Sequence, residues 1–371
     1  MEQNKKVLIS GASFAGLTMA YWLSNAGYDV TVVEIASKLK MGGSPVDIKD
    51  ATVDIVRRMG LFEQIKANRL NVELWEFKNT DDVTESSMLL RQPGEGLPDD
   101  EFEIERDTLL NILFDTVKNN VEFIFNNSVT GLDETENNVQ VTLKDGQQRN
   151  YDLVFGCDGI HSVIRKICFG KEGDYSHFLG QYFFITIVDK LLIKQNTLQL
   201  YGVPNKGVML NAYKNKTDIV LTFRSEEEIP YDYRDKVQQQ QIILEQFERQ
   251  GWRTAELLEE VQKSTNFYFD KFCQIKMPSW TKGRVALVGD AGYCASPGAG
   301  MGGSLAIIGA TALTDALEKH DGNFELAFND YNVELRPFIE EVQSAAVNML
   351  EHLLPRTDEE IRRRNKEGFN F

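Results

Sequence analysis

The sequence predicts an α/β protein in which a strand–turn–helix–strand domain is interrupted by an inserted β-sheet domain and followed by C-terminal helices. Three observations predict this architecture. Residues 6–34 read as a short apolar strand, a glycine-rich turn, an apolar stretch with helical spacing and a second β-rich run. Residues 182–223 hold four β-type runs that turns separate, which is typical of an antiparallel meander. Helical spacing returns at 237–262 and 304–317, on either side of a buried-strand candidate at 285–288.

The chain of 371 residues is too long for one ordinary core, so we expect two interleaved domains. The strand–turn–helix–strand domain is expected to be discontinuous, and the β-sheet domain to be inserted into it in two pieces. The expected ranges are 1–73, 99–173 and 275–335 for the first domain, 74–98 and 174–274 for the second, and 336–371 for a C-terminal helical segment.

The glycine-rich turn has the residues that a dinucleotide site needs. Gly11 and Gly16 permit a tight turn and close backbone approach, and the helix that follows offers free N–H groups and a positive dipole end to a pyrophosphate. Ser13 stands where a glycine is usual, and this small residue costs the turn little. Glu34 closes the second β run, where a carboxylate accepts hydrogen bonds from an adenosine ribose. The segment therefore predicts a Rossmann-like domain with cofactor contacts at Gly11, Ser13, Phe14, Ala15, Gly16 and Glu34.

The composition argues against several classes of partner. The formal net charge of −16 repels nucleic acid and an anionic membrane surface alike, so we expect neither as a partner. No apolar run approaches the length of a bilayer span. Four cysteines without paired spacing and four scattered histidines favour a reducing cytoplasm and no metal site. We expect a cytoplasmic protein that is a monomer or a weak dimer.

Two further motifs make the first one more specific. One is Asp158-Gly159 within residues 152–165, and the other is Gly289-Asp290, which the glycine-rich residues 298–303 follow. With these motifs the chain resembles the FAD-dependent aromatic hydroxylases, the single-component flavin monooxygenases with a para-hydroxybenzoate hydroxylase fold. That family carries an N-terminal GxGxxG, a central Asp-Gly motif and a C-terminal Gly-Asp motif, in this order and at about this spacing.

The resemblance implies FAD as the cofactor and gives roles to residues beyond the first turn. A fourth family signature, Arg-x-x-Leu, begins at Arg106, which contacts FAD by the family pattern, with Asp47 nearby. The compact size and Gly42-Gly43 ahead of Asp47 are similar to the tetracycline-inactivating branch. An ionised Asp290 would accept a hydrogen bond from a ribityl hydroxyl of FAD. The positive end of the helix that starts near Ser304 would stabilise an anionic reduced flavin by about 0.3–2 kcal/mol. The other expected cofactor contacts are Lys40, Asp158, Gly300, Met301 and Gly302.

The chain departs from the family pattern where proton and electron transfer are concerned. Tyr293 stands where the family has a histidine, so no histidine is available there for a proton relay. Met301 stands where glutamine is common, which removes an amide near the flavin. No second glycine-rich βαβ unit is evident, so we expect NADPH or NADH to dock transiently as the electron donor. Taken alone, Asp158-Gly159 would be an ordinary turn and Arg165 a solvated charge.

The inserted β-sheet domain is expected to form the floor of a substrate site over the flavin ring. Pro297 is the preferred substrate-side contact, because it abuts the ring-binding glycines. The amphipathic stretch 338–354 either caps the pocket or serves plain domain packing. Five aromatic side chains are candidates for the pocket lining, although for any single one an ordinary sheet core is the stronger interpretation: Tyr182, Phe184, Tyr201, Tyr213 and Phe223.

The resemblance implies an FAD-dependent monooxygenase. NAD(P)H would reduce the flavin, O₂ would add to give a flavin hydroperoxide, and its terminal oxygen would hydroxylate an aromatic or polycyclic, tetracycline-like molecule. Because this chemistry belongs to the cofactor, no catalytic side chain is expected. A flavin-dependent halogenase shares the fold, but the four tryptophans do not form its Trp-x-Trp-x-Ile-Pro signature. A flavin reductase or dehydrogenase without oxygen transfer, and a non-catalytic flavin-binding protein, remain open alternatives.

Overall fold

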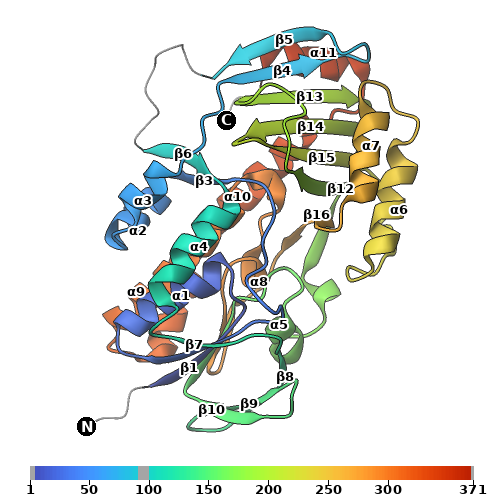
Figure 1. The fold of residues 1–371 in the computed structure, drawn as a ribbon. Coiled ribbons are helices and arrows are strands. Elements are labelled where there is room, and N and C mark those ends of the chain that lie inside the picture. Colours follow the sequence, from blue (N-terminus) through green and yellow to red (C-terminus); the bar gives the residue numbers. More distant parts are fainter. Residues whose placement is uncertain (1–4, 91–99, 369–371) are drawn as a thin grey trace.

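The computed structural model describes residues 5–90 and 100–368, which form two large sheets with helices between and around them (Figure 1). In the lower sheet of Figure 1, β1 lies between β2 and β11 and pairs with both in parallel. Val7, Leu8 and Ile9 are fully buried, because a central parallel strand is covered on both faces. In sheet order the six strands are β17 (Thr281–Lys282), β18 (Val285–Leu287), β11 (Leu153–Gly156), β1 (Lys6–Ser10), β2 (Asp29–Val33) and β7 (Glu122–Ile124).

Helices and two small sheets complete the lower part of the molecule. The helix α1 (Phe14–Asn25) packs against both α4 (Arg106–Val117) and α9 (Gly302–Lys319), and α9 confirms the helix predicted at 304–317. The helix α5 (Val163–Cys168) packs against β8 and β11. The remaining elements here are β3 (Val46–Lys49) paired with β6 (Glu101–Ile104), the helices α2 (Ala51–Arg58) and α3 (Phe62–Ala67), and a small sheet of β8 (Val129–Glu134), β9 (Val139–Leu143) and β10 (Gln148–Tyr151).

The upper sheet of Figure 1 contains the predicted antiparallel meander. Strands β12, β15, β14 and β13 pair antiparallel in that spatial order, while β13 pairs in parallel with β4 from much earlier in the chain. Residues 91–98 of the predicted insertion lie outside the described residues. In sheet order the seven strands are β16 (Phe267–Ile275), β12 (Ser176–Val188), β15 (Lys216–Arg224), β14 (Lys206–Tyr213), β13 (Thr197–Val203), β4 (Leu74–Lys78) and β5 (Thr84–Leu89).

Two helices cover one face of the upper sheet, at the right of Figure 1: α6 (Lys236–Phe247) and α7 (Thr254–Lys263). The helical character predicted for 237–262 is confirmed, and the structure divides it into two helices between Phe247 and Thr254. In the connection between α6 and α7, Trp252 has a left-handed φ of 57°, which is incompatible with an α-helix. A Cβ on Gly251 would lie 2.3 Å from the Thr80 side chain, so this residue passes close to the β4–β5 turn.

The C-terminal helices link the two sheets. The helix α10 (Phe324–Leu353) is 30 residues long and continues through Pro337. Near its end, Met349 and Leu353 pack on Leu198 and Leu200, on the face of the upper sheet opposite α6 and α7. The last helix, α11 (Asp358–Glu367), packs on β5 and β13. C-terminal helices are therefore confirmed, but the predicted boundary at 335/336 falls inside α10, and the domain division stays a prediction.

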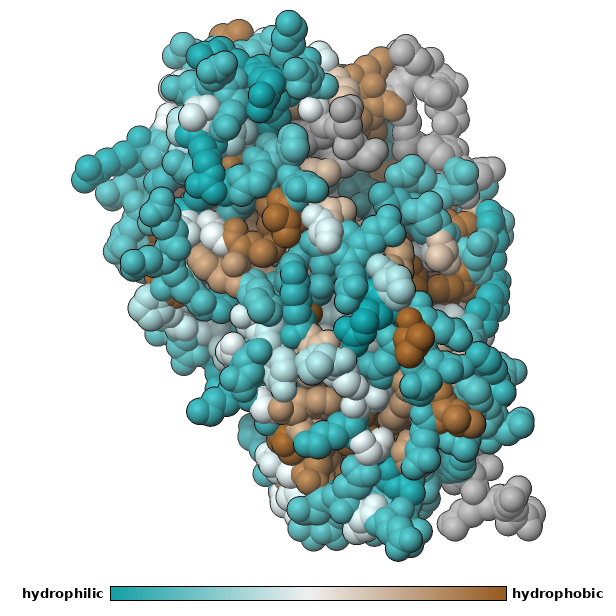
Figure 2. Space-filling model, turned by 180° about the vertical axis from the view of Figure 1, so that it is seen from behind, coloured by the Kyte–Doolittle hydropathy of each residue, from teal (hydrophilic) through white to brown (hydrophobic). Residues whose placement is uncertain are grey.

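The surface seen from behind is mostly hydrophilic, with hydrophobic side chains in separate small groups (Figure 2). Within the described ranges, no helix is both long enough and apolar enough to cross a bilayer.

Candidate functional site

The glycine-rich turn between β1 and α1 depends on both of its glycines. Gly11 has a φ of 105°, and a Cβ there would lie 2.4 Å from the carbonyl oxygen of Cys157. A Cβ on Gly16 would lie 1.9 Å from the carbonyl oxygen of Gly11. Ser13 precedes the first residue of α1, and among the described residues its hydroxyl makes no capping hydrogen bond to that helix. The first-turn N–H groups of α1 therefore have no side-chain cap, which suits an anion.

Glu34 lies directly beside this turn. Its carboxylate accepts the backbone N–H of Ala12 at 2.9 Å and that of Ala36 at 2.9 Å, one on each oxygen. Each oxygen has a further lone pair that can accept another donor. The side chain is only half-buried, so a ribose hydroxyl could reach it.

Arg106, the first residue of α4, ties three predicted cofactor contacts together. Its Nη1 donates to the carbonyl oxygens of Lys40 at 2.9 Å and Gly42 at 3.1 Å. Its Nη2 donates to Ser13 Oγ at 3.2 Å, and its guanidinium lies 5.3 Å from the centre of the Phe14 ring. Burial lowers the pKa of Arg106, but a guanidinium stays charged in proteins. The arginine therefore brings a positive charge to the turn.

Asp290 opens the short helix α8 (Asp290–Tyr293) at the end of β18. Burial raises the pKa of Asp290, while a hydrogen bond donated by the Cys294 thiol and the charges of Arg106 and Arg165 lower it. Asp290 and Arg106 are thus electrostatically coupled although 184 positions separate them in sequence (290 − 106). A Cβ on Gly289 would lie 3.3 Å from Ala15 Cβ, so the glycine lets this strand end pack against α1.

The glycine-rich loop before α9 packs against β3. It contains the short 3₁₀ helix η2 (Pro297–Ala299) and Gly300 in the left-handed conformation. A Cβ on Gly300 would lie 3.6 Å from Asp47 Oδ2, and Ser304 Oγ donates to the Asp47 carbonyl oxygen at 2.8 Å. Burial raises the pKa of the Asp47 carboxyl. Met301 precedes α9 and, within the described chain, gives it no side-chain cap, so a second helix N-terminus lies open at this loop.

The comparisons with known proteins agree with this geometry. A family model described as an FAD binding domain matches residues 4–342. A flavin-dependent monooxygenase of Legionella longbeachae is 37% identical over 361 residues, which cover 95% of this chain and 91% of that protein. This chain belongs to the flavin-dependent monooxygenase family. It is thus an FAD-binding oxidoreductase, and the reductase and non-catalytic alternatives have no such support.

Three further proteins are similar along nearly the whole chain. The crystal structure of the tetracycline destructase Tet(51) is 34% identical and covers 98% of this chain and 95% of its own, with a TM-score of 0.88. The FAD-dependent monooxygenase asL6 of Sarocladium schorii is 30% identical and covers 93% of this chain and 88% of its own length. Klebsiella pneumoniae HpxO, crystallised with FAD and uric acid, is 16% identical with a TM-score of 0.76, which shows the shared fold alone.

Four of the five aromatic candidates for the substrate lining pack in the interior of the monooxygenase instead. Tyr182, Phe184, Tyr201 and Phe223 are at most 3% exposed and belong to the core between the upper sheet and helices α6 and α7. Tyr182 stacks on Phe223, with ring centroids 5.2 Å apart. This packing argues against a role in lining a pocket on the opposite face of the sheet. The sequence could not show it, because strand alternation defines two faces without indicating which face a second layer covers.

Tyr213 is different, because it lies on the face opposite α6 and α7. Its position on β14 alternates with Val208 and Leu210, which point into the core under those helices. The Tyr213 hydroxyl donates to Asp218 at 2.7 Å, and burial raises the pKa of this aspartate to about 7. Pro297 is exposed on the glycine-rich loop, and a Cβ on the next residue would lie 2.5 Å from Leu350 of α10.

Asp158 supports a loop, and Arg165 is not a solvated charge. The Asp158 carboxylate accepts the N–H groups of Val163 at 2.8 Å and Ile164 at 3.1 Å, at the start of α5. Arg165 is fully buried and donates to the Ala291 carbonyl oxygen at 2.8 Å and to that of Ile160. It thereby joins the Asp-Gly loop to the Gly-Asp loop, a role that its position in the sequence did not reveal.

Tyr293, which replaces the family's histidine, points into the core. It is 1% exposed, and its hydroxyl is 2.9 Å from that of Tyr331. A Cβ on Gly309 would lie 1.7 Å from the Tyr293 hydroxyl, so α9 passes directly over it. The position therefore offers no proton relay to the site.

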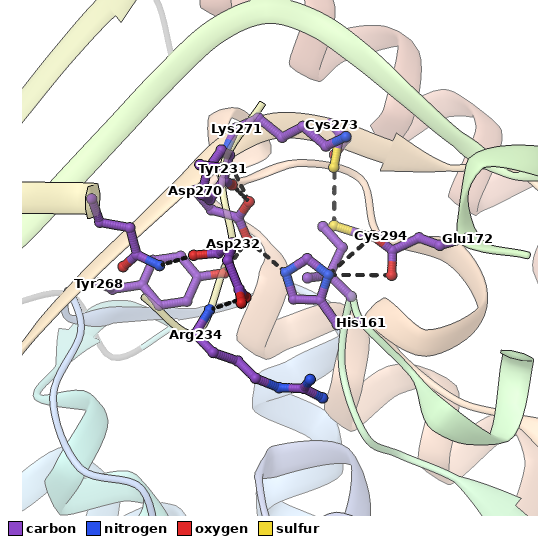
Figure 3. Close-up of polar contacts among 12 residues, drawn as sticks. His161, Glu172, Tyr231, Asp232, Arg234, Tyr268, Asp270, Lys271, Cys273 and Cys294 are labelled. Atoms are coloured by element: carbon purple, nitrogen blue, oxygen red, sulfur yellow. Dashed lines mark hydrogen bonds and ion pairs between the residues drawn. The ribbon is translucent and has the colours of Figure 1, made fainter. Parts of the chain in front are cut away.

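Sequence analysis missed a polar cluster between the two sheets (Figure 3). His161 lies between Glu172 and Asp270 in this view, and Tyr268 and Tyr231 donate to the same aspartate. Strand alternation places Tyr268 and Asp270 on one face of β16, but nothing in the sequence pairs them with His161, 109 positions earlier than Asp270 (270 − 161). In the part of the chain that the structure describes, no group of three or more histidine, cysteine or acidic side chains could hold a metal ion.

Proposed function

We propose that this monooxygenase takes electrons from NADPH or NADH and transfers one oxygen atom of O₂ to an aromatic or polycyclic, tetracycline-like small molecule. The observation that carries the proposal is similarity along the whole chain to Tet(51) and Tet(55), both called tetracycline destructases, at 34% and 33% identity with TM-scores of 0.88 and 0.86. We further propose a cytoplasmic protein that is a monomer or a weak dimer and binds neither nucleic acid nor membranes, in keeping with a net charge of −16.

The proposed FAD site runs from the glycine-rich turn to the N-terminus of α9. The open N-terminus of α1 would take the pyrophosphate, with Arg106 adding a positive charge, and Glu34 would accept the ribose hydroxyls. Asp290 would accept a hydrogen bond from a hydroxyl of the ribityl chain. The N-terminus of α9 would face the flavin ring. The support is that two helix N-termini without side-chain caps in the described residues lie close together, since a Cβ on Gly303 would lie 3.4 Å from the Phe14 ring. The half-buried Arg106 donates to Ser13 beside them. The other proposed contacts are Gly11, Ser13, Phe14, Ala15, Gly16, Lys40, Asp47, Asp158, Gly300, Met301 and Gly302.

FAD, when bound, supplies the electron and oxygen chemistry, and the chain orients the substrate and excludes water. We propose that the face of the upper sheet that carries Tyr213 forms the substrate floor. Glu105, the neighbour of Arg106, pairs with Lys214 of the β14–β15 turn at 2.9 Å and with Lys216, the first residue of β15, at 3.1 Å. These ion pairs anchor the Tyr213 end of the sheet next to the proposed FAD site. Pro297 would contact the substrate from the glycine-rich loop.

Labelled oxygen tests the proposed function. The purified holoenzyme is mixed with tetracycline, ¹⁸O₂ and either NADPH or NADH, and the product is examined by mass spectrometry. One ¹⁸O atom per product molecule is the expected result. Recovery of all reducing equivalents as hydrogen peroxide, across tetracyclines, phenols and polyketides, would contradict oxygen transfer. Consumption of NAD(P)H alone decides nothing, because reduced flavin also reacts with O₂ without a substrate.

A further inference from the structure

The cluster in Figure 3 joins the loop after Asp158 to the edge strand of the upper sheet. His161 Nδ1 lies 3.0 Å from Glu172 Oε1 in η1 (Glu172–Asp174), and His161 Nε2 lies 3.3 Å from Asp270 Oδ2 on β16. The imidazole also stacks on Tyr233, with ring centroids 4.1 Å apart. His161 and Glu172 are each about a fifth exposed, whereas Asp270 is 2% exposed. The cluster therefore runs from the surface into the interior.

Asp270 is the buried centre of the cluster. Tyr268 donates to its Oδ2 at 2.8 Å, and Tyr231 donates to its Oδ1 at 2.5 Å. The backbone N–H of Lys271 also donates to Oδ1 at 2.8 Å. Burial alone would raise the pKa of Asp270, but the hydrogen bonds from His161 and the two tyrosines lower it. The carboxylate is therefore ionised and can accept a proton from either side.

The two tyrosines lead in opposite directions from Asp270. Tyr231 packs on the rings of Phe269 and Tyr182, in the core under α6 and α7. Tyr268 is on the other face, with Lys40 Nζ 5.5 Å from the centre of its ring. Its hydroxyl is also electrostatically coupled to Arg106 and Asp290. Only Tyr268 thus faces the residues of the proposed FAD site.

We propose that Tyr268, Asp270 and His161 form a path that carries one proton between the FAD site and solvent. In the inward direction the Tyr268 hydroxyl releases its proton to the site. Asp270 Oδ2 returns a proton to the Tyr268 oxygen and takes one from His161 Nε2. The neutral imidazole that remains keeps its proton on Nδ1, beside Glu172, and is reprotonated from solvent at the vacated Nε2. One proton enters and one leaves, so the three side chains end as they began. This path takes the place of the histidine that Tyr293 replaces.

The charges around His161 set the pH at which the path works. Burial would lower the pKa of His161, but its hydrogen bonds to Asp270 and Glu172 raise it to about 8. The other charged and titratable groups on this side are Lys166, 3.3 Å from Glu172 Oε2, Arg165, 3.5 Å from the same oxygen, and Arg234, 4.8 Å from the centre of the Tyr233 ring. Inward delivery needs protonated His161, so its rate should fall as the pH rises through about 8.

The path can be tested without a substrate, so its outcome is separate from that of the proposed function. Two-electron reduction of bound FAD by reduced methyl viologen takes up one proton, and the oxidation of this donor releases none. We would follow flavin bleaching and proton uptake together by anaerobic stopped flow, with a pH indicator in weak buffer. The wild-type holoenzyme is compared with Tyr268→Phe and with Tyr231→Phe. The second variant is the matched control, because it removes another hydroxyl from the same carboxylate on the side away from the site.

We expect Tyr268→Phe to slow proton uptake about tenfold or more, because a positioned acid–base group contributes a rate factor of about 10²–10⁴. Tyr231→Phe should change the rate less than about twofold, and wild-type uptake should fall above pH 8. Equal rates in the three proteins, or equal losses in both variants, would overturn the proposal. FAD content and melting temperature, measured on each variant, identify a protein that has merely lost its cofactor or fold.

The protonation of His161 gives a readout independent of reduction. The chain has four histidines, so comparison with His161→Gln assigns the His161 imidazole signals in an NMR titration. The wild-type signals should titrate near pH 8, and Asp270→Asn should lower that midpoint by removing a charged partner. A wild-type midpoint at or below the ordinary value of about 6.5 would overturn the proposed charge arrangement.

Discussion

The glycine-rich turn and the upper sheet differ in what decides where a side chain points. In the turn, the backbone alone decides, since a Cβ on Gly16 would lie 1.9 Å from the Gly11 carbonyl oxygen. In the sheet, alternation assigns Tyr182 and Tyr213 to opposite faces, but the packing of α6 and α7 decides which face becomes core. A local motif therefore predicts contacts residue by residue. An alternating strand predicts only which side chains share a face, and not which of the two faces is buried.

The sheet side of this comparison gives the largest expected effect. Phe223→Ala should lower the free energy of unfolding by about 3–5 kcal/mol, because it empties a site in a core where the side chain is fully buried. FAD affinity should stay within about twofold, since the ring packs away from the proposed cofactor site. Denaturant unfolding and FAD titration measure the two quantities. If Phe223→Ala left the free energy of unfolding unchanged but weakened substrate binding, Phe223 would line the substrate pocket and not the core.

The turn side is tested by Gly16→Ala. The added Cβ would meet backbone rather than a movable side chain, so we expect a cost of about 3 kcal/mol, or ~100-fold weaker FAD binding. Gly131→Ala is the matched control, because its Cβ would make an ordinary 3.5 Å contact with Thr142. FAD retained per chain after gel filtration reports the result. Full retention in Gly16→Ala would mean that the turn is not the cofactor contact we propose.

A smaller effect is expected at Glu34. A hydrogen bond to a charged group contributes about 1.5–3 kcal/mol, so Glu34→Ala should weaken FAD binding about tenfold or more. Asp29→Ala removes an exposed carboxylate from the start of β2, the strand that Glu34 follows, and should not change FAD affinity measurably. Equilibrium dialysis of both variants sharpens the comparison. Equal FAD affinities in the two variants would mean that Glu34 does not bind the ribose and serves only to accept the backbone N–H groups of Ala12 and Ala36.

The sequence predicted the elements well wherever the pattern was local. The strands around the turn, the meander and α9 are confirmed, because each depends on spacing within one segment. The helical character predicted at 237–262 is also confirmed, but the sequence did not show the break between α6 and α7, where Gly251 lies close to Thr80, 171 positions earlier (251 − 80).

The polar contacts show the same limit. Arg165 is buried, and its partners come from two segments: Ile160 is nearby in sequence, whereas Ala291 of α8 is 126 positions away. His161 meets Asp270 only because the two sheets come together. A single sequence carries no signal for such pairs, since neither spacing nor composition records which loops the fold brings into contact.

A crystal structure of the FAD complex tests the central claim most directly. The account predicts that Glu34, Arg106 and Asp290 all lie within about 3.5 Å of one FAD molecule, at hydrogen-bonding distance. It also predicts that Tyr182 and Phe223 stay in the core under α6 and α7, without contact to the flavin. A structure in which any of the three charged residues lies far from FAD, or in which the two aromatic rings contact it, would contradict the account.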